Sequence, residues 1–231
     1  MANKYLKLSK YKDFLVRKLF GRMHTTYSQC GEDLILDYLQ HGKENGFYVD
    51  IGANDPREFS NTYYFYKKGW QGLVIEPNLT KLNQYKFFRS RDERLHMAVG
   101  AKGEFTFFKF KEDPLNTMSE EVAKSYEKMG HKIQKTEKVL CAPLSEIFKD
   151  KLKNNKHINL MSIDTEGQNF EVLQTNDWDV YRPKFLVIET AEFDKPDDES
   201  LEEKYNTYLT ERGYKKVANT AFNSIYKNVR N

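Results

Sequence analysis

The 231-residue sequence predicts an α/β fold with a mostly parallel sheet and helices on both faces. Three observations predict it. Short apolar runs recur along the chain, stretches with helical spacing of apolar residues separate them, and most of the runs contain few polar residues. Strands that are buried on both faces have that last property. The length suits a single domain with a short appendage.

The first 24 residues predict a basic amphipathic helix that precedes a main domain over residues 25–231. Leu8, Tyr11, Leu15 and Leu19 follow helical spacing, and lysines fill the other faces. Two hypotheses stay open. The helix packs on its own domain or mediates a homo-oligomer, or it contacts anionic lipid or an acidic partner.

The first half of the main domain alternates between helices and strands. The stretch 25–40 predicts a helix with Ser28 as cap and two acids, Glu32 and Asp33, in the first turn. Asn78 is the expected cap of a later helix. The predicted strands are 46–52, 72–77, 95–100 and 103–110, and the predicted helices are 61–69 and 78–90.

The second half continues the alternation after a polar interruption. Residues 113–137 have weak helical spacing and few large apolar residues, which indicates an insertion or flap. A closing antiparallel pair is expected over 214–228. The other predicted strands are at 138–142, 158–164 and 184–190, with helices from Pro143 or Leu144, over 169–175 and over 198–213.

Acidic side chains stand at the carboxyl ends of most predicted parallel strands: Asp50, Glu76, Asp164 and Glu189. Ligands of open parallel sheets bind at this edge. Burying a carboxylate without a partner is costly, so a purely structural protein has little reason to repeat this arrangement. The acids therefore predict a ligand site.

The turn after the first strand, "VDIGAND", limits the kind of ligand. A dinucleotide site needs G-x-G-x-x-G, whereas Gly52 is the only glycine in this turn, and the sequence contains no G-x-x-x-x-G-K-[ST] phosphate loop. An adenosine-type ligand without phosphates fits better. Glu76 is placed to hold ribose hydroxyls, and the alternative is an acid that begins the next helix beside Pro77.

Several motifs resemble, in order, those of FkbM-type S-adenosylmethionine-dependent methyltransferases. They are "YSQCGEDLIL", "FYVDIGAND", "SNTYYFYKKGWQGLVIEPN", "MAVG" and "SIDTEGQNFEVL", which span about Tyr27 to Glu192. The resemblance implies a Rossmann-like class I methyltransferase fold with a seven-stranded sheet. One departure from the family pattern is Asp55-Pro56 after the "DIGAN" motif, which still suits a helix start.

The resemblance also implies which residues bind S-adenosylmethionine. Tyr27, Gln29 and Glu32 would close the site from the N-terminal segment, and Gln29 also belongs to the binding set. That set is Gln29, Asp50, Gly52, Ala53, Asn54, Ser60, Asn61, Glu76, Pro77, Met97 and Ala98.

The stretch "SIDTEGQNFEVL" is where acceptor and methyl group are expected to meet. In related sugar and catechol O-methyltransferases, acids after strands four and five bind a divalent metal, and Asp164 and Glu189 occupy those places here. Mg²⁺ or Mn²⁺ suits such oxygen ligands. The alternative has no metal, with Asp164 or Glu166 as general base. Asn116, Thr117, Met118 and Ser119 of the flap are expected to line the acceptor pocket.

The expected activity is O-methylation of a sugar hydroxyl. The expected acceptor is a nucleotide-activated sugar used in surface-polysaccharide or glycoconjugate biosynthesis. Lys109, Lys111, Lys132 and Lys135 would face the nucleotide phosphates. Three alternatives stay open: a methyltransferase of protein or nucleic acid, one of another small molecule, and a non-catalytic adenosine-binding protein.

Charge and composition bound these alternatives. Net charge is +3, but the first 24 residues hold seven basic residues against one acid, so the main domain is mildly acidic. That argues against a nucleic-acid surface. With two cysteines, no secretory h-region and no run of the ~20 apolar residues that span a bilayer, a cytoplasmic protein is expected.

Overall fold

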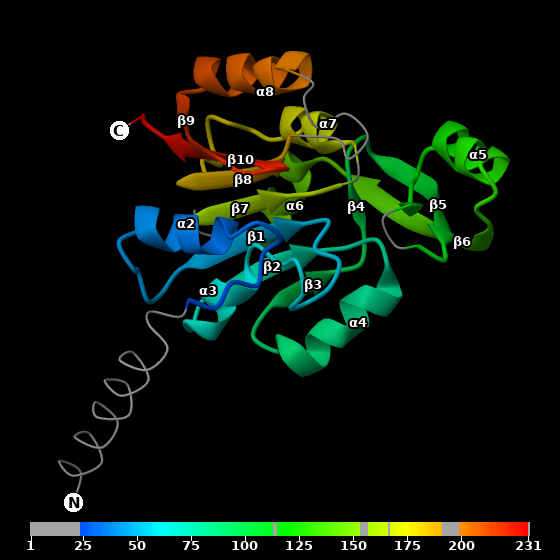
Figure 1. Ribbon diagram of the computed structural model, residues 1–231, viewed down its shortest axis with the longest axis horizontal. Coiled ribbons are helices and arrows are strands. Elements are labelled where there is room, and N and C mark those ends of the chain that lie inside the picture. Colours follow the sequence, from blue (N-terminus) through cyan, green and yellow to red (C-terminus); the bar gives the residue numbers. More distant parts are fainter. Residues whose placement is uncertain (1–23, 113–114, 153–156, 166, 191–198, 231) are drawn as a thin grey trace, which may run out of the picture.

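The computed structural model describes residues 24–112, 115–152, 157–165, 167–190 and 199–230. The predicted N-terminal helix, apart from residue 24, lies outside these ranges, as does the predicted general base Glu166. Within them the chain forms one large sheet with helices on both faces and a smaller sheet beside it (Figure 1).

The large sheet has seven strands in the order β3-β2-β1-β7-β8-β10-β9. Neighbours pair in parallel from β3 to β8, whereas β10 runs antiparallel to both β8 and β9. The predicted mostly parallel, seven-stranded sheet is therefore confirmed. Its strands are β1 (Phe47–Ile51), β2 (Gln71–Ile75), β3 (Glu93–Leu95), β7 (Leu160–Ile163), β8 (Phe185–Glu189), β9 (Tyr214–Asn219) and β10 (Asn223–Asn228).

The helices divide between the two faces because alternate strand residues point to opposite sides. Val49, Ile51 and Leu73 share one core with α6 (Leu144–Lys151), α7 (Asn169–Gln174) and α8 (Glu199–Glu211). Tyr48 shares another with α2 (Glu32–Leu39) and α3 (Tyr63–Lys67). Val74 faces α4 (Leu79–Phe88). Residues of both faces are almost fully buried, which explains the apolar runs in the sequence.

The flap arm, defined as residues 103–142, forms the projection at the right of Figure 1. It consists of β5 (Gly103–Phe110), α5 (Glu120–Lys128) and β6 (Ile133–Ala142). β6 pairs antiparallel with β5 and parallel with the short β4 (Ala98–Val99). The predicted flap at 113–137 thus belongs to a larger unit, and the strand predicted at 138–142 begins at Ile133.

The prediction of one strand over residues 95–100 is wrong. β3 ends at Leu95 in the large sheet, and Ala98–Val99 pair with Cys141 and Ala142 in the small sheet. The chain changes sheets within one apolar run, and hydrophobic periodicity cannot reveal a change of pairing partner.

Ser28 is not the N-cap residue of α2, contrary to the prediction, although its hydroxyl oxygen accepts from the first-turn amide of Asp33 at 3.3 Å. The cap is Gly31, with φ 87°, and it makes no side-chain capping bond. The Ser28 hydroxyl also donates to Asp33 Oδ1 at 3.0 Å, and the Tyr27 amide donates to Asp33 Oδ2 at 2.7 Å. Asp33 is fully buried and binds the donors of the preceding loop, which explains an acid at this position.

Candidate functional site

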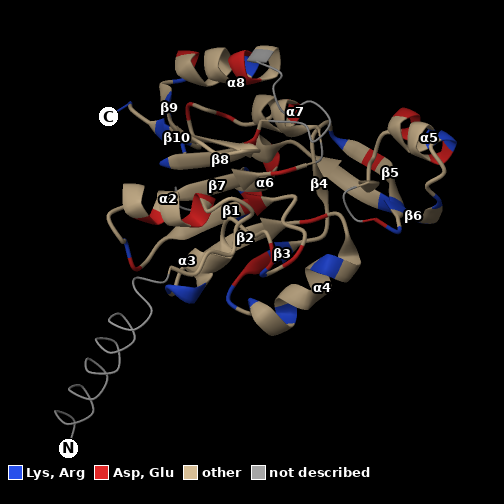
Figure 2. Cartoon of the chain, in the orientation of Figure 1, with Lys and Arg blue, Asp and Glu red and all other residues tan. Residues whose placement is uncertain are grey.

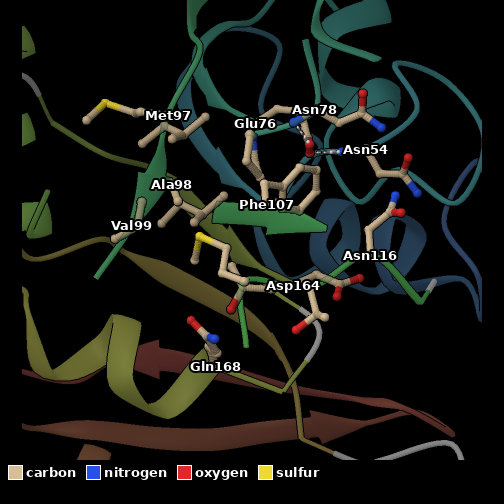
Figure 3. A pocket seen from close by; sticks show the side chains of 17 residues that line it. Asn54, Glu76, Asn78, Met97, Ala98, Val99, Phe107, Asn116, Asp164 and Gln168 are labelled. Atoms are coloured by element: carbon tan, nitrogen blue, oxygen red, sulfur yellow. Dashed lines mark hydrogen bonds between the residues drawn. The ribbon is translucent and has the colours of Figure 1, made fainter. Parts of the chain in front are cut away.

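A pocket opens at the carboxyl edge of the large sheet, between β1, β2, β7 and the flap arm (Figure 3). It encloses about 800 Å³, including its mouth to solvent. The lining residues are Ile51, Gly52, Asn54, Ile75, Glu76, Pro77, Asn78, Met97, Ala98, Val99, Phe107, Asn116, Thr117, Met118, Asp164, Thr165 and Gln168. A cavity thus lies at the edge of the sheet where the sequence predicts a ligand site.

Gly52 lets two strand ends come together at the floor of this pocket. Its φ is 72°, in the left-handed region that glycine favours. A Cβ atom at this position would lie 1.7 Å from the Asp164 carbonyl oxygen, so no other residue fits without moving the backbone. Asp164 in turn donates its amide to Ile51 O at 3.0 Å. The turn after β1 and the turn after β7 are therefore packed as one unit.

Glu76 presents a buried carboxylate whose two oxygens are oriented by backbone amides. Asn78 N donates to Oε1 at 2.6 Å and Asn54 N donates to Oε2 at 2.9 Å, drawn as dashed lines in Figure 3. Burial raises the pKa of Glu76 to about 7, although these two hydrogen bonds oppose the increase. Each oxygen keeps a second lone pair for a donor on a ligand.

Asp50 lies beneath the pocket instead of lining it. Its carboxylate accepts a hydrogen bond from Thr62 Oγ1 and lies 3.8 Å from the Arg89 guanidinium. Arg89 is fully buried and also donates to Asp92 Oδ2 at 2.7 Å. Burial raises the pKa of Asp50 to about 6, and the Arg89 charge opposes that increase. Asp50 thus belongs to a network of side chains under β1.

Apolar side chains form another wall of the pocket. Met97, Ala98 and Val99 come from the segment between the two sheets, and Phe107, only 5% exposed, comes from β5. Met97 and Ala98 were predicted, whereas Phe107 was not. The alternation in "GEFTFFKF" indicated a strand, but several phenylalanines competed for the inward positions. This wall suits a flat apolar group such as a purine.

The β7–α7 turn carries the acidic side of the pocket. Asp164 and Thr165 line it, and the buried Asn169 orients the turn by accepting from Thr165 N at 2.6 Å and from Thr165 Oγ1 at 2.8 Å. Asn169 Nδ2 also donates to Glu189 O at 3.0 Å. This amide therefore ties the end of β7 to the end of β8. The sequence marked Asp164 but not the role of Asn169.

The flap arm contributes a third wall, called the polar wall, which is formed by Asn116, Thr117 and the less polar Met118. Their predicted contact with the acceptor stays a prediction. Backbone bonds between Phe108 and Thr117, at 2.8 and 3.1 Å, hold this segment against β5. The fourth predicted flap residue, Ser119, caps α5 by accepting from Val122 N.

The predicted cofactor residues divide into two groups. Those that line the pocket are Gly52, Asn54, Glu76, Pro77, Met97 and Ala98. Those that do not are Gln29, Asp50, Ala53, Ser60 and Asn61. Of this second group, Gln29 is exposed and Ser60 contacts Arg89. For both groups, contact with the cofactor stays a prediction.

Glu32, which was expected to close the site, does not line the pocket. Glu32 is fully buried and accepts from Thr220 and Asn223 at 2.6 and 2.9 Å, so it joins α2 to the β9–β10 turn. Asp164 lines the pocket and Glu189 does not. No three His, Cys, Asp or Glu side chains gather as a metal site in the part of the chain that the structure describes.

The sequence profile of the FkbM methyltransferase domain matches residues 50–216, most of the chain. The chain belongs to the FkbM methyltransferase family. The protein is therefore a methyltransferase, and its strand order, with the single antiparallel β10, is the class I methyltransferase fold. The family identified from its motifs is confirmed.

Solved structures resemble this FkbM-family chain only distantly. One is cofactor-bound Rv0187 from MTB, at 10% identity, with 96% of this chain and 97% of that chain covered and a TM-score of 0.49. Another is Burkholderia thailandensis 1,6-didemethyltoxoflavin-N1-methyltransferase with S-adenosylhomocysteine, at 10% identity, 97% and 88% coverage and a TM-score of 0.43. No curated protein sequence matches the chain.

None of the described helices is both long and apolar enough to cross a bilayer.

Proposed function

We propose that this FkbM-family methyltransferase uses S-adenosylmethionine to methylate a sugar hydroxyl. The observation that carries the proposal is the pocket itself. Its lining combines the Glu76 carboxylate, an apolar wall, Asp164 and the flap residues Asn116–Met118. Ribose, adenine and an acceptor hydroxyl would each meet a suitable group there.

The residues present fit S-adenosylmethionine. Glu76 Oε1 and Oε2 are already aligned by two amides and can accept from vicinal hydroxyls, which suits a ribose. Met97, Ala98 and Phe107 supply apolar surface for the adenine. When bound, S-adenosylmethionine supplies an electrophilic methyl group on a sulfonium. The chain's own contribution is to hold the acceptor oxygen in line with that methyl group and to exclude water.

Asp164 is the residue we assign as general base, since it lines the pocket at the end of β7. Its carboxylate would take the proton of the acceptor hydroxyl as the oxygen–carbon bond forms. A divalent cation is not needed for this step. Of the two predicted metal ligands, Asp164 lines the pocket and Glu189 does not, so the proposed role of Asp164 is that of a base.

Charge supports an acceptor that is neutral where it reacts. The charged side chains in the pocket lining are two acids, Glu76 and Asp164, whereas Asn54, Asn116 and Gln168 offer uncharged donors and acceptors. Figure 2 places the described Lys and Arg residues on several elements instead of one continuous tract. A sugar suits this lining better than a nucleic acid does.

A nucleotide-activated sugar, used for surface polysaccharide or glycoconjugate synthesis, stays within the proposal if its phosphates lie outside the pocket lining. Lys109, one of the four lysines expected to meet them, is already bound to Asn78 and Glu137. We place the reaction in the cytoplasm, where the two free cysteines, exposed Cys30 and buried Cys141, stay reduced.

The test measures S-adenosylhomocysteine release over a panel of neutral sugars, sugar phosphates and nucleotide-sugars, with and without a chelator. We expect turnover with a sugar, unchanged by chelation, and its loss in Asp164→Asn with S-adenosylmethionine binding retained. The exposed Asp179→Asn is the matched control and keeps full activity. Turnover of a protein, a nucleic acid or another small molecule, with none of the sugars, would contradict the sugar acceptor. An absence of S-adenosylmethionine binding would contradict the proposed cofactor.

A further inference from the structure

The flap arm and the cofactor side of the pocket meet at one lysine. Lys109 Nζ, on β5, donates to Asn78 Oδ1 at 2.8 Å and to Thr80 Oγ1 at 3.4 Å, both at the start of α4. Its side chain is only 15% exposed, and Glu137 Oε1 of β6 lies 3.7 Å away. The Lys109 ammonium group is therefore held between the flap arm and the start of α4.

On the cofactor side, the lysine contacts the residue that orients Glu76. Asn78 accepts from Lys109 through its side chain while its own backbone amide donates to Glu76 Oε1 at 2.6 Å. Asn78 is 5% exposed and also caps α4 by accepting from Thr80 N at 3.1 Å. Its position is thus fixed by the helix start, the lysine and the carboxylate together.

On the acceptor side, Lys109 stands between the two residues that hold the polar wall. Phe108 exchanges two backbone hydrogen bonds with Thr117, and Phe110 N donates to Asn116 Oδ1 at 2.8 Å. Lys109 also shares a strand face with Phe107, two residues earlier, which lines the pocket. A shift of Lys109 would therefore move both the apolar wall and the polar wall.

We propose that Lys109 is a positioning residue that couples cofactor binding at Glu76 to the order of the polar wall, Asn116–Met118. A cofactor that holds Glu76 holds Asn78, and through Lys109 it holds β5 and the wall paired to it. Binding of the cofactor then prepares the acceptor site, which is a coupling free energy between two sites. The inference rests on the proposed use of S-adenosylmethionine.

The experiment follows amide hydrogen exchange with S-adenosylhomocysteine as the probe, so that it needs no acceptor. In wild type, the probe slows exchange at residues 52–54 and 76–80 and also at 105–110 and 115–118. In Lys109→Met we expect the first protection to persist at saturation and the second to fall about tenfold or more. Lys109→Arg, which keeps the charge and its donors, restores part of it.

Lys138→Met is the matched control. Lys138 lies on the same hairpin and donates to Thr106 Oγ1 at 3.0 Å, but it is exposed and does not line the pocket. Protection in this variant stays as in wild type. Equal flap protection in wild type and Lys109→Met, or none in wild type despite binding, overturns the coupling. If calorimetry detects no binding of the probe to wild type, the proposed cofactor use fails first and the coupling with it.

Discussion

Asp50 and Glu76 end neighbouring strands of the sheet, and both are buried carboxylates with raised pKa values. Their surroundings differ. Asp50 contacts the side chains of Thr62 and Arg89 beneath β1, whereas backbone amides hold Glu76 at the pocket wall. An acid at a strand end can therefore support the site from below or face the ligand. Only its partners distinguish the two roles.

The largest effect is expected from removing the cation beneath β1. Arg89→Met leaves Asp50 and Asp92 buried without their shared partner, which costs about 3–5 kcal/mol of unfolding free energy. Chemical denaturation measures the loss. The matched control is Lys102→Met. Lys102 forms a solvent-exposed ion pair with Glu146, and its removal should change stability little. A small effect of Arg89→Met would contradict the supporting role of the network.

The next prediction separates the two carboxylates directly. Glu76→Gln should weaken S-adenosylmethionine binding about 10- to 100-fold, since a hydrogen bond to a charged group contributes about 1.5–3 kcal/mol. Asp50→Asn should leave that affinity nearly unchanged. Both variants should lose about 1–3 kcal/mol of stability, because each disturbs a buried acceptor.

Calorimetric titration gives the affinities and denaturation gives the stabilities. Equal losses of affinity in the two variants would mean that Asp50 also contacts the cofactor, as its place in the "DIGAN" motif first suggested.

A third prediction concerns pH. The pKa of Glu76 rises from 4.5 to about 7 on folding because the group is buried. Between these values the folded chain binds more protons than the unfolded chain, so this group's contribution to stability is present below pH 4.5 and is lost as pH rises to about 7. A hydroxyl ligand favours the ionised carboxylate, so S-adenosylmethionine affinity should increase over the same interval.

The measurement is the difference in unfolding free energy between wild type and Glu76→Gln from pH 4.5 to 8. Taking the difference removes groups common to both proteins, such as Glu32. Burial alone would raise the pKa of Glu32, but its hydrogen bonds, led by the one from Thr220, outweigh burial, and the pKa is lowered overall. The contribution of Glu32 to stability therefore depends on pH with the opposite sign. A difference that stays constant across this range would contradict a raised pKa at Glu76.

The sequence predicted the sheet and the acids at its edge because both follow from local patterns. Apolar runs mark buried strands, and Asp50, Glu76 and Asp164 follow them directly. It could not predict which way each acid faces. Asp50 meets Arg89, which ends α4 some forty residues later, and Glu32 meets Thr220 across most of the chain. Those contacts depend on how the elements pack.

Pocket residues were hardest to predict where one apolar run serves two structures. Residues 95–100 supply the end of β3, the pocket residue Met97 and the short β4. Phe107 points into the pocket because β5 belongs to the small sheet. No local sequence pattern predicted that β5 would pair outside the large sheet. Gly52 was recognised as part of a tight turn, but the backbone it must accommodate belongs to Asp164, more than a hundred residues away.

The smallest predicted effect tests the residue that joins the two regions. The Tyr85 hydroxyl donates to Ala53 O at 2.8 Å and approaches Asp55 O at 3.4 Å, and its ring lies 4.9 Å from the Arg89 guanidinium. Tyr85→Phe frees the loop that carries Asn54, a donor to Glu76. We expect a stability loss of about 1 kcal/mol and a few-fold loss of S-adenosylmethionine affinity.

Tyr214→Phe is the matched control for that variant. Its hydroxyl is equally buried and donates to Pro183 O at 2.8 Å, away from the pocket. The same stability loss should therefore come without any change in affinity. If both variants keep wild-type affinity, the network beneath β1 stabilises the domain but does not position the loop. The Asp50 and Glu76 regions would then be energetically separate despite their adjacent strands.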